Sequence, residues 1–133
     1  MNALFEKISP LASLTGRVLI ALIFIISGYG KIGGYEGTQA YMAAMGVPGS
    51  LLPLVIITEL GGGVLIVLGL FTRYAALALA GFALLSAFLF HGGSGDQMQH
   101  IMFMKNLAIA GGFLFLVATG AGKFSLDSRM GQS

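Results

Sequence analysis

Three charged side chains interrupt long apolar runs of this sequence. Arg17, Glu59 and Lys105 each stand as the single charge in a run long enough to form a membrane helix. A charge at the centre of such a helix costs about 2.5–3.5 kcal/mol, and it marks a functional site by default. A buried carboxylate can relay protons, whereas a lysine or an arginine can polarise a carbonyl oxygen. We therefore take these three residues as candidates for intramembrane chemistry.

The depth of each charge predicts which of them meet. Glu59 lies about 12 Å into its helix and Lys105 about 6 Å below the same surface, at about 1.5 Å per residue. A lysine side chain can span the difference, so we expect Glu59 and Lys105 to be partners. Arg17 enters from the opposite surface and reaches Glu59 only through a water or a ligand. The alternative is that these ions only hold helices together, although buried pairs seldom stabilise more than apolar replacements.

The elements that must position these charges are helices. Each of the four apolar runs is long enough to cross the hydrocarbon core, which needs about 17–25 residues, and none of them alternates as a strand would. We expect an all-α bundle of four transmembrane helices forming a single domain over residues 1–133. A short helix in the membrane interface is expected near residues 35–45, between the first two spans. The expected spans are Leu11–Gly30, Leu51–Phe71, Tyr74–Phe90 and Ile101–Ala121.

The composition agrees with a protein whose solvent is lipid. Of the 133 residues, 56 % are apolar and only 9 % are charged, against about 25 % charged in soluble domains. A net charge of +2 without any run of Lys or Arg excludes nucleic acid as a partner. The chain has no cysteine, which excludes disulfides and thiolate-bound metals.

The basic residues outside the spans predict the orientation. Lys7, Arg73, Lys123 and Arg129 fall on the side that holds both termini, and Lys31 alone falls on the other side. The positive-inside rule places both termini in the cytoplasm of a plasma-membrane protein, the inner membrane in a bacterium.

Small residues predict how the helices associate. Ala76, Ala80, Ala83 and Ala87 form a stripe along one helix face, as expected of a close helix–helix contact. The contact lies either within one bundle or also between copies of the chain in a homo-oligomer.

Two histidines flank the second external loop, with Asp96 between them. Imidazole is a common metal ligand, and nearby methionines would suit Cu(I). Interfacial histidines and methionines in an apolar chain are more often solvated or packed, so we predict no metal site. The two residues are His91 and His100.

Four segments together resemble the DoxX family of small four-helix membrane proteins, in order and in placement on separate helices. The resemblance implies an association with quinone-linked redox processes, and it points to Lys31, Asn106, Arg73 and His91 beside the three buried charges. The segments are Gly16–Leu19 with Ser27–Lys31, Glu59–Gly63 with Leu68–Arg73, Phe88–His91, and Met104–Ala108 with Gly111-Gly112.

Together these patterns favour a membrane subunit of a quinone-linked redox system. Glu59 and Lys105 would be its catalytic pair, and Arg17, Lys31, Asn106 and His91 would bind the ligand. A quinone is the candidate cofactor, and because the sequence offers no electron carrier, a redox partner protein is expected. The alternative is a non-enzymatic scaffold or small-molecule-binding protein. Solute transport is less favoured, because four spans leave little room for paired repeats.

Overall fold

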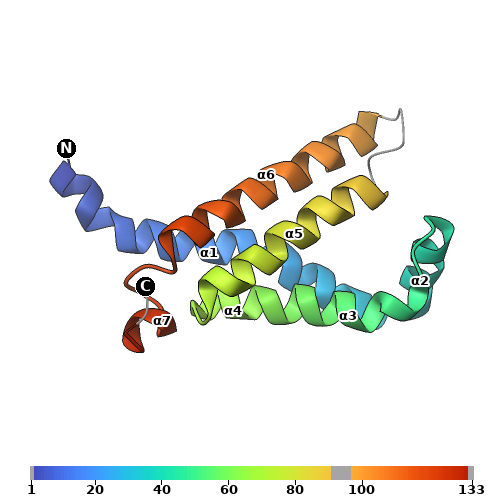
Figure 1. The fold of residues 1–133 in the computed structure, drawn as a ribbon, viewed down its shortest axis with the longest axis horizontal. Helices are drawn as coiled ribbons and strands as arrows, with labels where there is room; N and C mark the ends of the chain where they lie inside the picture. The colour runs from blue at the N-terminus through green and yellow to red at the C-terminus, as the bar shows by residue number, and fades with distance from the viewer. Residues whose placement is uncertain (1, 91–96, 132–133) are drawn as a thin grey trace.

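The computed structural model describes residues 2–90 and 97–131 of the chain, and this part contains helices and no strand. Figure 1 shows the long helices gathered into one elongated bundle. In chain order the elements are α1 (Asn2–Gly33), α2 (Tyr35–Ala44), η1 (Gly49–Leu51), α3 (Leu52–Ile56), η2 (Ile57–Gly61), α4 (Gly62–Leu68), α5 (Thr72–Phe90), α6 (Gln97–Thr119) and α7 (Leu126–Arg129).

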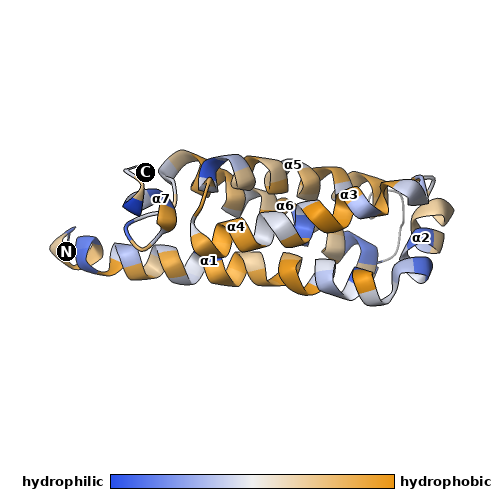
Figure 2. Ribbon diagram, turned by 90° about the horizontal axis from the view of Figure 1, so that it is seen from below, coloured by the Kyte–Doolittle hydropathy of each residue, from blue (hydrophilic) through white to orange (hydrophobic). Residues whose placement is uncertain are grey.

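Four stretches of the described chain are long and apolar enough to cross a membrane. They are α1, the helical stretch Gly49–Leu68, α5 and α6. Apolar residues cover most of their length, and hydrophilic residues gather toward the ends (Figure 2). Both termini and α7 lie at one end of the bundle, and α2 lies at the other. The expected all-α bundle with a short helix between the first two spans is confirmed.

The first helix is longer than the expected span. It begins at Asn2, runs through Pro10 and ends at Gly33 instead of Gly30. Gly30 and Gly33 are both helical, although glycine has a weak preference for helix. The extra turn matters for function, since it carries Lys31 on the helix rather than in a loop.

Small residues bring α5 against its neighbours. The stripe Ala76, Ala80, Ala83 and Ala87 is almost fully buried. Helices in lipid associate through close backbone approach, so a stripe of alanines is a natural contact face. The most extensive pairing of helices is that of α5 with α6, which confirms that this face packs within the bundle.

Glycines on both α1 and the second span let the two helices approach each other closely. A Cβ on Gly63 would lie 2.7 Å from Ile25 Cγ1, and a Cβ on Gly28 would lie 3.3 Å from Glu59 Cβ. Neither position leaves room for a larger residue without a shift of its neighbours. This close crossing places Glu59 directly beside α1.

Candidate functional site

Glu59 lies in a π-helical turn, η2, in the middle of the second span. The sequence predicts one regular helix there, whereas the structure has a 3₁₀ turn, a short α-helix, the π turn and α4. A π turn fits one extra residue into a helix, and such turns occur frequently at functional sites. The Glu59 side chain is 4 % exposed, so its charge is shielded from the surroundings of the bundle.

The partner of Glu59 is Lys31, not Lys105. Lys31 Nζ lies 2.5 Å from Glu59 Oε1 and also donates a hydrogen bond to Ser27 Oγ at 2.6 Å. The expected pairing with Lys105 is therefore wrong. It failed because Lys31 was expected beyond the end of the first span, while the longer α1 puts it one helical turn after Ser27.

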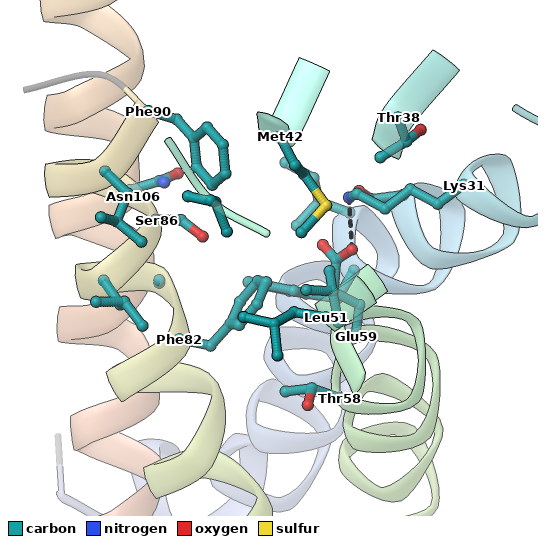
Figure 3. Close-up of a pocket in the computed structure, with 18 of the residues that line it drawn as sticks. Lys31, Thr38, Met42, Leu51, Thr58, Glu59, Phe82, Ser86, Phe90 and Asn106 are labelled. Carbon is teal, nitrogen blue, oxygen red and sulfur yellow. Dashed lines mark hydrogen bonds and ion pairs between the residues drawn. The ribbon is translucent and has the colours of Figure 1, made fainter. Parts of the chain in front are cut away.

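The ion pair forms part of the wall of a cavity of about 460 Å³ between α1, α2, α3, α5 and α6. Lys31 and Glu59 lie on one side of it, and Ser86, Phe90 and Asn106 lie on the opposite side (Figure 3). Such a volume and a mostly apolar wall with a few polar groups are typical of small-molecule sites. The polar lining consists of Ser27, Lys31, Thr38, Thr58, Glu59, Ser86, Lys105 and Asn106.

The helix α6 contributes a second cation to the cavity. Lys105 is partly buried, and its Nζ lies 3.6 Å from Met102 Sδ. Within residues 2–90 and 97–131, the only ion pair is that between Lys31 and Glu59. The lining in this part of the chain holds one acidic residue, Glu59, with Lys31 beside it and Lys105 as a further basic residue on α6. The site thus favours a ligand with an oxygen that can accept hydrogen bonds.

Aromatic rings enclose the apolar part of the same cavity. The rings of Phe24 and Phe82 meet edge to face at 6.4 Å, and Tyr41 of α2 stacks on Phe90 of α5 at 5.6 Å. Thr38, Tyr41 and Met42 of α2 all line the cavity. The short helix therefore completes the wall of the cavity, a role that its sequence pattern did not indicate.

Arg17 does not line this cavity, so its expected role in binding a ligand near Glu59 stays a prediction. It is 1 % exposed and donates hydrogen bonds to the carbonyl oxygens of Ile66 at 2.9 Å and Val67 at 3.0 Å. A further hydrogen bond runs to the carbonyl oxygen of Phe124. Arg17 thereby joins the first span, the end of the second and the C-terminal segment.

We call Arg17 and the three carbonyl oxygens that it contacts the Arg17 cluster. The acidic residue near this cluster is Asp127 of α7. Its carboxylate accepts hydrogen bonds from the amides of Phe71 at 2.8 Å and Thr72 at 2.9 Å, and so caps the start of α5 from a distant part of the chain. Burial raises the pKa of Asp127, but these amide hydrogen bonds and the Arg17 charge outweigh it and hold the pKa below 3.8.

We expect Asp127 to make the stability of the fold fall at acidic pH. A carboxyl group whose pKa falls on folding stabilises the native state above its unfolded pKa of 3.8, and this contribution disappears as the pH falls through the folded pKa. The melting temperature in detergent should therefore drop below about pH 4. Asp127→Asn should lower the melting temperature at pH 7 and flatten its dependence on pH. Glu36→Gln, at an exposed position of α2, should have neither effect. Parallel profiles for wild type and Asp127→Asn would contradict this assignment.

The sequence between α5 and α6 contains His91 and Asp96. His91 and Asp96 lie outside the described residues, so the role of His91 in ligand binding stays a prediction. His100 is an exposed residue in the first turn of α6 and does not line the cavity.

Comparison with known proteins agrees with this architecture. The DoxX family model matches residues 12–92, which include Arg17, Lys31 and Glu59 but not Lys105 or Asn106. No solved structure matches the chain significantly.

Full-length relatives come from the inner membrane of Escherichia coli. Inner membrane protein YqjF is 53 % identical over 92 % of this chain and 94 % of its own length. Inner membrane protein YphA is 40 % identical over 94 % of each. A protein of Bacillus subtilis with the name "Putative oxidoreductase CatD" is 35 % identical over 60 % of this chain and 57 % of its own length. The chain is thus a membrane protein that belongs to the DoxX family.

Proposed function

We propose that this protein is the membrane subunit of a quinone-linked redox system and that it binds the quinone head group in the cavity beside Glu59. The observation that carries the proposal is the Lys31–Glu59 ion pair in the wall of a largely apolar cavity with Lys105 as a second cation. The ring of a quinone is apolar, whereas its two carbonyl oxygens accept hydrogen bonds. The name of the Bacillus subtilis relative adds weaker support for redox chemistry.

The side chains that line the cavity have different roles in this proposal. Lys105 and Asn106 on α6 can donate hydrogen bonds to one carbonyl oxygen, and Lys31 can donate to the other from α1. Phe24 and Phe82 supply a wall for the ring. Glu59 is placed to relay protons from solvent to the carbonyl oxygens, and reduction to the quinol takes two such protons together with two electrons, which a redox partner protein supplies.

A non-enzymatic scaffold is the second candidate function. The Arg17 cluster favours it, because there a buried charge donates hydrogen bonds to carbonyl oxygens of the second span and the C-terminal segment and so joins three segments. In this alternative the Lys31–Glu59 pair likewise only joins α1 to the second span, and the cavity takes part in no redox reaction.

Binding of a short-tailed benzoquinone to the purified protein in mild detergent tests the proposal. We expect saturable binding by equilibrium dialysis, weakened roughly tenfold or more by Glu59→Gln or Lys31→Met, because each removes a charge-assisted interaction. Ser86→Leu should block binding by filling the cavity. The control Glu36→Gln removes a carboxylate from α2 outside the cavity lining, and it should bind as the wild type does.

Two results would contradict the proposed function. One is a folded wild-type protein that binds no benzoquinone. The other is binding that Ser86→Leu and Glu59→Gln leave unchanged, since the ligand would then lie elsewhere in the bundle.

A further inference from the structure

A second cavity, of about 580 Å³, lies between α1 and α6 at the end of the bundle that holds both termini. We call it the α1–α6 groove. Its lining comes from α1 between Ser9 and Ile20, from α6 between Gly112 and Thr119, and from the segment up to Lys123. No residue of this groove lines the cavity beside Glu59, so the two sites are separate.

The charged residues of the groove are basic. Arg17 and Lys123 line it, and no carboxylate does so in the part of the chain that the structure describes. Arg17 Nε is buried and lacks a hydrogen-bond partner among the described residues, although the other guanidinium nitrogens are bonded. The nearby Asp127 is occupied by the amides of Phe71 and Thr72. Asp127, outside the lining, partly offsets the charge of Arg17, but the lining itself keeps a positive potential because it holds two basic groups and, among the described residues, no carboxylate.

The surroundings strengthen this potential. Five of the seven Lys and Arg residues of the chain belong to the segments at this end, against two of the five acidic residues, Glu6 and Asp127. The basic residues are Lys7, Arg17, Arg73, Lys123 and Arg129. Each basic group near a membrane surface attracts anionic lipids, and basic pockets between membrane helices bind their head groups.

The groove turns apolar as it leaves this basic end. Ile20, Phe115 and Leu116 line it toward the middle of the bundle, and Phe115 is largely exposed. A Cβ on Gly16 would meet no atom within 4 Å, so the absence of a side chain there leaves the furrow open. Ser9 and Ser13 place hydroxyl groups at the polar end. A basic, hydroxyl-rich pocket that continues into an apolar furrow has the polarity of one phospholipid.

We propose that the α1–α6 groove binds an anionic phospholipid of the surrounding bilayer. Its phosphate lies near Lys123 and the hydroxyl of Ser9, since the Ser13 hydroxyl donates to the carbonyl oxygen of Ala121, and one acyl chain follows Ile20 and Phe115 along the furrow. The fixed charge of Arg17 favours an anionic over a zwitterionic head group. A free phosphate ion would use the same polar end, but it would gain nothing from the apolar furrow.

Native mass spectrometry of the purified protein with added phosphatidylglycerol or phosphatidylcholine of equal acyl chains tests this site. We expect one phosphatidylglycerol to remain bound where phosphatidylcholine does not. Lys123→Gln should weaken retention about fivefold, the effect of one basic group at a membrane surface. Gly16→Leu should abolish retention because its side chain fills the furrow.

Matched variants separate the groove from general electrostatics and from misfolding. Arg129→Gln removes an equal charge outside the groove, and Gly81→Leu adds an equal side chain at another open glycine, on α5. Both should retain the lipid as the wild type does. An equal loss for Arg129→Gln and Lys123→Gln, equal retention of both lipids, or displacement of the lipid by inorganic phosphate would each overturn the proposal.

Discussion

Replacing Arg17 by methionine is expected to lower the free energy of unfolding by about 3 kcal/mol or more. The guanidinium group donates to the carbonyl oxygens of Ile66, Val67 and Phe124. Methionine fills part of the space but leaves these buried oxygens without a donor, and each hydrogen bond to a charged group is worth about 1.5–3 kcal/mol. Lysine should recover only part of the loss, since it has no planar fork to reach three oxygens at once.

Thermal unfolding followed by circular dichroism in detergent measures this effect. Arg73→Met is the matched control, because Arg73 is an exposed arginine at the start of α5. An equal melting temperature for Arg17→Met and Arg73→Met would mean that the carbonyl cluster adds little to stability.

Lys31→Met is expected to destabilise the protein by about 3–5 kcal/mol, because it leaves the Glu59 carboxylate buried without its cation. The double variant Lys31→Met/Glu59→Gln should regain much of this loss, since a neutral pair needs no compensating charge. Unfolding of the wild type, both single variants and the double variant gives the coupling between the two residues. Independent, additive losses would show that the ion pair contributes little.

The double variant also separates the two candidate functions. If the pair serves a ligand, the double variant should be nearly as stable as the wild type but should bind benzoquinone weakly. If the pair only joins α1 to the second span, the double variant should be less stable than the wild type, and its behaviour toward benzoquinone should be that of the wild type.

The fold follows from the sequence because its determinants are local and repeated. A membrane span needs a long apolar run, and each of the four runs corresponds to a helical stretch in the structure. The alanine stripe from Ala76 to Ala87 is likewise visible as a spacing, and the structure buries it as expected.

The site was harder to predict, for two physical reasons. The identity of the partner of Glu59 depends on whether α1 ends at Gly30 or at Gly33, and glycine-rich helix ends carry little local preference. The π turn at Glu59 also adds one residue to the helix, so the side chains around it face directions that a regular helical period does not predict.

The Arg17 cluster escaped prediction for a different reason. Its partners are backbone carbonyl oxygens, which every residue has, so the sequence carries no mark of them. Only Asp127 could have been noticed as a lone acid after the last span, and nothing in its neighbours points to the start of α5.

The hydrogen bond between Arg17 and Phe124 also sets an order of events during biosynthesis. The two residues are 107 positions apart, so at roughly 5–20 residues per second the ribosome needs on the order of 10 s to make the second after the first. During that interval the first helix carries a guanidinium group whose final acceptor does not yet exist. The carbonyl oxygens of Ile66 and Val67 become available earlier, so a nascent chain can satisfy part of this charge within the bundle, but it completes the native contacts of Arg17 only after Phe124 has been translated.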